Sequence, residues 1–411
     1  MNKVKTVRLQ LSSLSVFRGI LNRTIPKAFY NLLCSLDKKP EEFLSIYGEF
    51  FSLISERGCA DNLAYAITET ALFDENCFTR AAAGGTYDSL PDEVLRAVKR
   101  DCLSILSAAT LSADEVLNAY AFSADIARII EGLPKWECGE CAESFRGFDG
   151  SLRKRASWYR ENGCGMFARY KAFVWRDGSI QPVLHPDAID LDDLTGYELQ
   201  RKKVLSNTKA FLEGKSCNNC LLYGDMGTGK SSTVKAIANR FRKSGLRIVE
   251  IPKEKIVEFP LLVERIAALP MKFIIFIDDL SFQDQGQSYT TLKAVLEGGV
   301  SAQPKNALIY ATSNRRHIVK ERLSDRAFEV DDINTRDNMQ ESLSLSDRFG
   351  LSVCFTAPSK KEYIKIVCAL AAQRGLDISE SELAAGAERF ALAKGGRSPR
   401  AAKQYVESLF C

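Results

Sequence analysis

The sequence predicts an α/β protein with a five-stranded parallel sheet, helices on both faces of the sheet, a C-terminal helical lid and an N-terminal helical domain. Three observations support this fold class. From about residue 189, apolar runs alternate with helical patterns, a glycine-rich loop follows the first of these runs, and the C-terminal region is again purely helical in pattern. We expect four segments, namely a helical domain (1–150), a connector (151–188), the sheet domain (189–356) and the lid (357–411).

Length, charge and hydropathy set broad limits on function. The chain has 411 residues, enough for two or three domains that each bury a core. Its 56 basic and 52 acidic residues are mixed along the whole length and give a net charge of +4, so nucleic acid is neither required nor excluded as a partner. No apolar run approaches the roughly 18 residues that span a bilayer, so we expect a cytoplasmic protein with no membrane partner.

The N-terminal 150 residues show helical periodicity and no catalytic spacing. In the segment PEEFLSIYGEFFSLISERG, Pro40 suits the first turn of a helix and Gly58 its end. The apolar positions between them fall on one helical stripe: Phe43, Tyr47, Phe50 and Ile54. We expect a helical bundle that docks an unidentified protein partner.

Cysteines and one basic cluster leave alternatives open. The chain has 12 cysteines without the spacing of a disulfide framework, so reduced thiols are expected. The pairs Cys138/Cys141 and Cys217/Cys220 have the ligand count of a structural zinc site, but they lie far apart and the second adjoins a strand run, which favours packing or chance. The connector carries a basic cluster that is either a solvated face or a contact to phosphates of nucleic acid: Arg153, Lys154, Arg155 and Arg160.

The sheet domain is predicted from five apolar runs, which cover residues 220–224, 246–251, 272–278, 307–312 and 351–356. Between the first two runs, apolar side chains recur at helical spacing at Val234, Ile237, Ala238 and Phe241, and Gly245 ends that helix. A strand, a helix and a second strand in this order form the repeating unit of a parallel sheet. After the last run, helix-capping signals at Ser359, Ser379 and Ser398 indicate the small helical lid.

The first strand run leads into the loop GDMGTGKSS, which matches the pattern G-x-x-x-x-G-K-[ST] and opens a helix. Glycines let such a loop wrap closely, so that backbone N–H groups and the positive helix end face phosphate oxygens. We expect Lys230 to reach the β and γ phosphates of ATP and Ser231 to ligate Mg²⁺. The remaining contacts to ATP are expected from Gly224, Asp225, Met226, Gly227, Thr228, Gly229 and Ser232.

Polar residues also follow two later strand runs. Asp278 and Asp279 end the run at 272–278, beside the expected phosphate loop, because open α/β sheets bind ligands at the carboxyl ends of their strands. We expect Asp278 to hold Mg²⁺ and Asp279 to polarise the attacking water. Asn314, after the next run, is expected to orient that water or to touch the γ phosphate, although Asn and Ser in a turn are the alternative.

Two arginines lack a local structural reason. Arg400 falls in the first turn of the last helix, where the helix dipole disfavours a cation and a nearby phosphate would explain it. Arg348 precedes the last strand run in a polar segment and is placed to project from the edge of the domain. A solvated surface arginine is the alternative at both positions.

Together these motifs resemble the AAA+ superfamily across residues 189–411. The resemblance implies that Gly224 to Ser231 is Walker A, that Asp278 and Asp279 are Walker B, and that Asn314, Arg348 and Arg400 are sensor 1, the arginine finger and sensor 2. The stretch DLDDLTGYELQ resembles the segment that helps to enclose adenine, with contacts from Thr195, Gly196 and Tyr197.

More narrowly, NNCLLYGDMGTGKSS, FIDDLSF, LKAVLEGG, ATSNRRH and SLSDRFGL resemble a prokaryotic AAA+ family known as domain of unknown function 815. The resemblance implies a homo-oligomeric ATPase that hydrolyses MgATP to remodel or load a partner, with Arg348 acting on the neighbouring subunit. The alternative is an ATP-gated binding or loader module with slow or absent hydrolysis, for which nucleic acid is one candidate partner. Two departures from the family pattern bear on the choice. Asp279 stands where most AAA+ ATPases have Glu, which would weaken the activation of water or make the protein a slow switch. No aromatic–glycine pore loop follows LRIVEI, which argues against the threading of a polypeptide.

Overall fold

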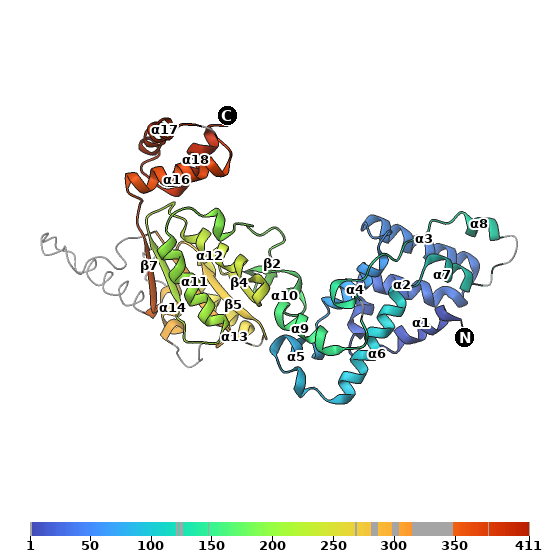
Figure 1. The fold of residues 1–411 in the computed structure, drawn as a ribbon. Coiled ribbons are helices and arrows are strands. Elements are labelled where there is room, and N and C mark those ends of the chain that lie inside the picture. The colour runs from blue at the N-terminus through green and yellow to red at the C-terminus, as the bar shows by residue number, and fades with distance from the viewer. Residues whose placement is uncertain are drawn as a thin grey trace, which may run out of the picture. The chain divides into compact units, whose positions relative to one another are not determined.

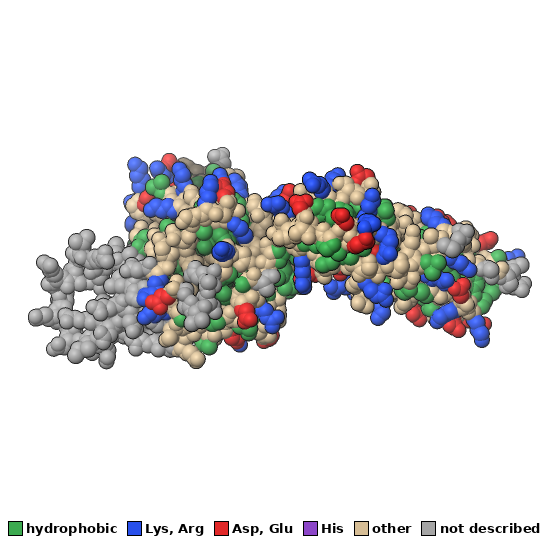
Figure 2. All heavy atoms as spheres, turned by 90° about the horizontal axis from the view of Figure 1, so that it is seen from below, with side chains coloured by type: hydrophobic (Ala, Val, Ile, Leu, Met, Phe, Trp, Pro, Cys, Tyr) green, Lys and Arg blue, Asp and Glu red, His purple; other side chains and the backbone are tan. Residues whose placement is uncertain are grey.

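A computed structural model describes residues 2–120, 122, 126–146, 148–267, 269–280, 287–297, 304–314, 348–376 and 378–410. It divides the chain into two compact units, Met1–Arg169 and Tyr170–Cys411 (Figure 1). The finer division expected at residues 150, 188 and 356 stays a prediction. On the face shown in Figure 2, basic and acidic side chains are interspersed over both units. Among the described residues, no helix is long and apolar enough to cross a membrane.

In the part that the structure describes, unit 1 consists of helices joined by irregular segments and contains no strand. Its elements are α1 (Lys3–Ser12), α2 (Thr24–Cys34), α3 (Pro40–Glu56), α4 (Leu63–Leu72), α5 (Cys77–Gly84), α6 (Asp92–Ala109), α7 (Ala113–Ala119), α8 (Ala127–Glu131), α9 (Leu152–Asn162) and α10 (Met166–Arg169). Helix α3 starts at Pro40 and buries the stripe that its periodicity predicts. Its Phe50 ring packs against Phe29 and Trp136 at centroid distances of 5.4 and 5.3 Å, so aromatic contacts build much of this core.

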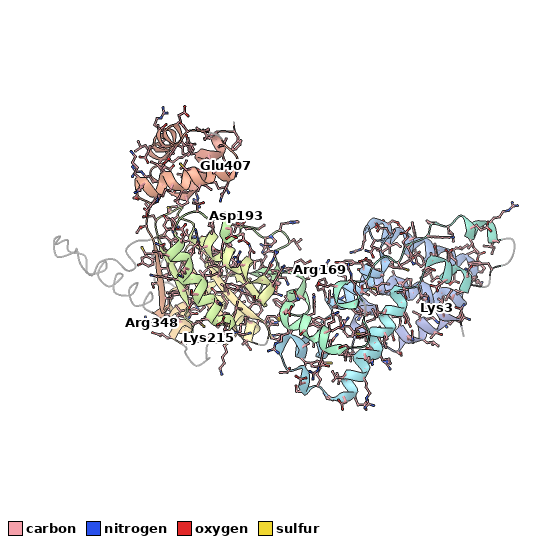
Figure 3. All side chains as sticks on the ribbon, viewed as in Figure 1. Lys3, Arg169, Asp193, Lys215, Arg348 and Glu407 are labelled. Carbon is pink, nitrogen blue, oxygen red and sulfur yellow. The ribbon has the colours of Figure 1, made fainter. Side chains whose placement is uncertain are left out.

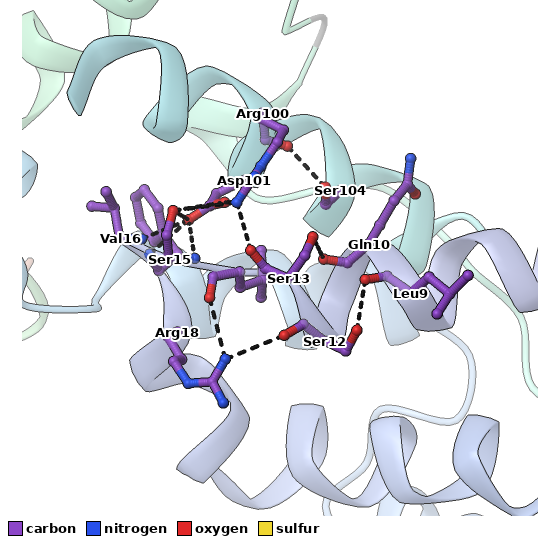
Figure 4. A network of polar contacts seen from close by, with 12 residues as sticks. Leu9, Gln10, Ser12, Ser13, Ser15, Val16, Arg18, Arg100, Asp101 and Ser104 are labelled. Atoms are coloured by element: carbon purple, nitrogen blue, oxygen red, sulfur yellow. Dashed lines mark hydrogen bonds and ion pairs between the residues drawn. The ribbon is translucent and has the colours of Figure 1, made fainter. Parts of the chain in front are cut away.

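A buried carboxylate joins two helices of unit 1 (Figure 4). Asp101 of α6 is fully buried, and its Oδ2 accepts the backbone N–H groups of Ser15, Val16 and Phe17 at 2.9, 2.8 and 3.1 Å. Because an ionised carboxylate is costly to bury without donors, these three bonds compensate its lost hydration. Asp101 thereby fixes the turn after α1 against α6.

Unit 2 is built on a seven-stranded sheet with the order β2-β1-β4-β5-β6-β3-β7. The five expected strands are β3 (Cys220–Gly224), β4 (Leu246–Glu250), β5 (Lys272–Ile277), β6 (Ala307–Ser313) and β7 (Leu351–Phe355), and they pair in parallel. The sheet is larger than expected, because β1 (Ala172–Arg176) and β2 (Ser179–Pro182) come from the segment predicted as a connector. Asp177 and Gly178, both at positive φ, form the two-residue turn of this antiparallel hairpin.

Helices cover both faces of the sheet (Figure 1). They are α11 (Glu198–Leu212) and α12 (Lys230–Arg240), and then α13 (Phe259–Ala267) and α14 (Gln287–Glu297). Ile274 of β5 shares one core with Val234 of α12. Its neighbour Ile275 lies instead beside Val263 of α13 and Val295 of α14. Since successive strand side chains point to opposite faces, the two helix pairs cover opposite sides of the sheet.

The lid consists of α16 (Lys360–Gln373), α17 (Glu380–Ala393) and α18 (Pro399–Ser408), with a core of its own. Ser359, Ser379 and Ser398 cap the three helices through side-chain oxygens, as their sequence signals predict. Figure 1 shows the lid beyond the carboxyl ends of the parallel strands, the edge to which the phosphate loop also belongs.

Candidate nucleotide-binding site

The loop between β3 and α12 is shaped by glycines and tied to β7. Gly224 has φ 127°, and a Cβ there would lie 2.2 Å from the Phe355 carbonyl oxygen, so only glycine fits. The next N–H, of Asp225, donates to the same carbonyl at 2.9 Å. Gly229, at φ 88°, caps α12 in a left-handed conformation. These constraints turn the loop so that the first turn of α12 faces the carboxyl edge of the sheet.

Lys230 supplies a buried positive charge inside this loop. Its side chain is almost fully buried, and its Nζ donates to the carbonyl oxygens of Gly224 and Asp225 at 3.1 and 2.7 Å. Burial lowers the pKa of the Lys230 ammonium, while the carboxylates of Asp225, Asp279 and Asp278 act in the opposite direction. A cation partly removed from water at the positive end of a helix is arranged to receive an anion.

Three oxygen groups meet beside Lys230. Asp278, directly after β5, accepts hydrogen bonds on Oδ1 from the hydroxyls of Ser231 and Thr312, each at 2.6 Å. Ser231 belongs to α12 and Thr312 to β6, so three separate elements converge at this carboxylate. Carboxylate and hydroxyl oxygens are hard ligands that suit Mg²⁺ together with water and phosphate. Ser231 and Asp278 therefore fit the metal-binding role expected for them.

Asp279 is held in a left-handed backbone conformation, with φ 53°. Its N–H donates to the Thr312 hydroxyl at 2.9 Å and to Asp278 Oδ1 at 3.1 Å. Its carboxylate accepts a hydrogen bond from the Asn314 side-chain amide, at 2.5 Å. The end of β6 thus brings Asn314 to Asp279, and the pair can hold a water molecule by an acceptor and a donor.

These groups line one cavity of about 1040 Å³ between the sheet and the lid. In Figure 3 the labels Asp193 and Glu407, which also line it, mark its sheet side and its lid side. Of the predicted site residues, the lining includes Thr195, Tyr197, Met226, Gly227, Thr228, Gly229, Lys230, Ser231, Ser232, Asp278, Asp279, Asn314 and Arg400. Those outside the lining are Gly196, Gly224, Asp225 and Arg348.

The lid touches the phosphate loop through α18. The backbone N–H of Arg400 donates to the carbonyl of Gly227 at 3.1 Å. A Cβ on Gly227 would lie 3.0 Å from Ser398 Oγ and 3.2 Å from Arg400 Cβ, so this glycine allows the close approach. The first turn of α18, with Arg400, therefore faces the same space as the first turn of α12.

The segment expected to enclose adenine links the sheet to the lid. The Tyr197 ring packs on Phe355 at a centroid distance of 5.3 Å, and its hydroxyl donates to the Thr356 carbonyl at 2.7 Å. Burial raises the pKa of this hydroxyl, so it stays a donor. Gly196 approaches Ile366 of α16, where a Cβ would lie 3.1 Å from Ile366 Cδ1. Thr195 and Tyr197 can contact a base, while Gly196 permits the packing behind them.

Several lining residues were not predicted. On the sheet side these include Asp187, Ala188 and Ile189, and on the lid side Gln373, Arg374, Lys403 and Gln404. Asn239 of α12 holds the first group, because its amide donates to the carbonyls of Asp187 and Ile189 at 2.9 and 2.8 Å. Arg201 of α11 also lines the cavity, and burial lowers the pKa of its guanidinium. No local sequence signal distinguishes these side chains from surface ones.

Arg348 lies at the amino ends of the parallel strands, whereas the cavity lies at their carboxyl ends. It precedes β7, which runs parallel to β3, and the phosphate loop follows β3. Five strand residues at about 3.3 Å each separate the two edges by roughly 17 Å. Arg348 Nε donates to Glu297 Oε1 of α14 at 2.6 Å, and Figure 3 shows Arg348 far from Asp193 and Glu407. The arginine therefore does not reach the cavity of its own chain.

The cysteine pairs do not form a joint site within one unit, since Cys138/Cys141 belong to unit 1 and Cys217/Cys220 to unit 2. In the described ranges, no group of three or more His, Cys, Asp or Glu side chains is placed to hold a metal ion. Burial raises the pKa of the thiols of Cys138 and Cys141. Both thiols are therefore protonated at neutral pH.

Comparison with known proteins identifies one family and two similar solved structures. The family model described as "Protein of unknown function (DUF815)" matches residues 168–411, more than half of the chain. The Thermotoga maritima RuvB Holliday junction branch migration motor is similar at 17% identity and a TM-score of 0.36, covering 53% of this chain and 63% of that one. A variant of that motor gives 18% identity, a TM-score of 0.37, and coverages of 53% and 64%.

This chain thus spans less than two thirds of the RuvB chains. No curated protein matches it. The family match begins just before β1 and includes every strand of the sheet, the phosphate loop and the lid. The chain belongs to the DUF815 family.

Proposed function

We propose that this protein is an ATPase that binds MgATP between the sheet and the lid and hydrolyses it in a homo-oligomer to remodel or load a protein partner. The observation that carries the proposal is the convergence of Lys230, the Ser231–Asp278 pair and the Asp279–Asn314 pair on one cavity. These residues follow three different strands, β3, β5 and β6, so chance chemistry in a single turn does not account for the arrangement.

The residues divide the chemistry between them. Backbone N–H groups of the phosphate loop and the Lys230 ammonium bind the triphosphate by charge and hydrogen bonds. Ser231 and Asp278 are the residues that would hold Mg²⁺, which neutralises charge on the β and γ phosphate oxygens when bound. Asn314 orients the water that attacks the γ phosphate, and Asp279 accepts a proton from that water. Arg400 lies on the lid side, where it meets the phosphates once the nucleotide is enclosed.

The proposed homo-oligomer rests on the position of Arg348. Since this side chain lies at the far edge of the sheet from its own cavity, it can act on a γ phosphate only in a neighbouring copy. Such a head-to-tail contact repeats from copy to copy and generates a ring if the rotation between copies closes. None of the residues that line the cavity belongs to unit 1, so we assign docking of the protein partner to that unit.

A second candidate function is an ATP-gated loader, acting on nucleic acid, with slow or absent hydrolysis. The bond from Asn314 to Asp279 favours it, because one carboxylate oxygen of a short side chain is already occupied. Steady-state ATP turnover measured with and without DNA separates the two functions. Turnover well above the uncatalysed rate supports the ATPase, whereas tight ATP binding without turnover supports the loader.

Lys230→Ala tests the nucleotide site itself. The substitution removes the positive charge that faces the phosphates, so calorimetry should show ATP binding weakened by about 1.5–3 kcal/mol, the range for hydrogen bonds to charged groups. Lys235→Ala is the matched control, because Lys235 lies on the same helix and does not line the cavity. Equal ATP affinity in Lys230→Ala and wild type would place the nucleotide elsewhere.

A further inference from the structure

The hydroxyl of Thr312 lies between the two acidic residues of the site. Thr312 is 2% exposed and belongs to β6, next to β5 in the sheet. Its Oγ1 donates to Asp278 Oδ1 at 2.6 Å and accepts the N–H of Asp279 at 2.9 Å. One buried side chain therefore satisfies a carboxylate and a backbone group of two successive residues.

The second of these bonds holds an unfavourable backbone conformation. Asp279 has φ 53°, a left-handed region that costs free energy for residues with a Cβ and that surrounding contacts must maintain. The following residue is tied to the same threonine, since the N–H of Leu280 donates to the Thr312 carbonyl at 2.7 Å. Thr312 thus fixes the turn after β5 through its side chain and its main chain.

The first bond determines how Asp278 presents its oxygens. Oδ1 receives hydrogen bonds from Ser231, Thr312 and the N–H of Asp279, and these donors orient the carboxylate plane. Ser231 is itself a candidate metal ligand, so its hydroxyl would bind Mg²⁺ in addition to donating to Asp278. Thr312 is not a candidate metal ligand, and its hydrogen bond keeps Asp278 in place when the Ser231 oxygen binds the metal. Partners of this kind govern both the affinity and the geometry of metal sites.

We infer that Thr312 is the positioning residue of this site, which orders Asp278 for Mg²⁺ binding and Asp279 for hydrolysis. The part that concerns hydrolysis rests on the proposed function. The part that concerns Asp278 requires only that the cavity binds a nucleotide with Mg²⁺. Neither part requires Thr312 to touch the substrate.

The test compares Thr312→Val, which keeps the shape and removes the hydroxyl, with Thr312→Ser, which keeps the hydroxyl. Thr208→Val is the matched control, because Thr208 of α11 is also fully buried and bonds to Val204 and Tyr310 away from the cavity. Calorimetry measures ATP binding by the full chain in EDTA and over a Mg²⁺ titration. Steady-state kinetics give kcat and KM.

We expect Thr312→Val to bind ATP in EDTA as the wild type does, and to need about 10–100-fold more Mg²⁺ for the same gain in affinity. Its kcat should fall by a similar factor, with a smaller change in KM. Thr312→Ser should restore both values to near wild type, and Thr208→Val should leave the Mg²⁺ titration unchanged.

Three results would overturn the inference. They are a Mg²⁺ titration of Thr312→Val that matches the wild type, a loss of ATP binding in EDTA as large as that in Mg²⁺, and a failure of Thr312→Ser to restore the response. A wild type that binds MgATP without turning it over would refute the proposed hydrolysis alone. A weakened Mg²⁺ response in Thr312→Val would then still support the assignment of Thr312 to Asp278.

Discussion

Replacing Arg348 with Ala tests the chemistry and the assembly together. An arginine placed against the charge that develops on the γ phosphoryl group accelerates transfer by about 10³ to 10⁵, which corresponds to roughly 4 to 7 kcal/mol. The Glu297–Arg348 ion pair at the partly exposed edge of the sheet is worth about 0–1 kcal/mol, so its loss cannot mimic that effect. We therefore expect Arg348→Ala to retain ATP affinity while turnover collapses.

Because roughly 17 Å separates the two ends of the strands, Arg348 can act only on a neighbouring copy. A mixing experiment tests this with a calculable result. Arg348→Ala keeps an intact phosphate loop, and Lys230→Ala keeps an intact Arg348. In a ring assembled at random from equal amounts of both, about one quarter of the interfaces join an intact loop to an intact arginine. Two variants that are each inactive should thus recover up to about a quarter of wild-type turnover when mixed.

The assay is phosphate release at several protein concentrations, with co-assembly checked by light scattering. Wild-type turnover per subunit should rise with concentration as copies associate. Arg265→Ala is a suitable control, because Arg265 is an exposed arginine on α13 of the same unit. A mixture that co-assembles and stays inactive, with turnover per subunit independent of concentration, would refute the action of Arg348 on a neighbour.

Three further predictions follow from the site and the fold. Asp279→Asn should bind MgATP normally and lose about 10²–10⁴-fold in kcat, so wild-type turnover would remove Asp279 from the mechanism. A chain of residues 170–411 should bind ATP with the affinity of the full chain, measured by calorimetry, provided that circular dichroism shows it folded. Burial, with Arg247 and Arg242 nearby, lowers the pKa of Lys171 from 10.5 to about 7, so the unfolded state binds more protons between these values. The free energy of unfolding should therefore rise with pH across that window, and Lys171→Met should flatten the rise in urea titrations.

Much of the fold follows from local patterns in the sequence. Short-range sequence signals predict the stripe of α3, the caps at Ser359 and Ser398 and the five parallel strands. The β1–β2 hairpin was not predicted as part of the sheet. Strand β1 gains its place by pairing in parallel with β4, more than 70 residues later in the sequence, and no local signal shows that partner.

The candidate site likewise contains residues whose positions follow from the sequence and residues whose positions do not. The phosphate loop, Asp278 and Asn314 follow strands, and strand ends in a parallel sheet meet at one edge, so their proximity can be derived from the sequence. The cavity wall of Asp187 to Ile189 depends instead on Asn239, a residue with an ordinary helix-surface pattern. The position of Arg348 was predicted only as a domain edge, and its pairing with Glu297 depends on where α14 ends.

The contacts between lid and phosphate loop bear on the timing of nucleotide exchange. The chain between β7 and α16 is held at two points, where the Tyr197 hydroxyl donates to Thr356 and the N–H of Ala357 donates to the Asp225 carboxylate. With the bond from Arg400 to Gly227, these are single hydrogen bonds. The two bonds to carbonyl oxygens are each worth about 0.5–1.5 kcal/mol net, and the bond to the Asp225 carboxylate about 1.5–3 kcal/mol. The described polar contacts that hold the lid over the phosphate loop are therefore few and individually weak compared with the burial of an apolar core. Under the proposed function, the lifetime of bound ADP would set how long the lid stays closed.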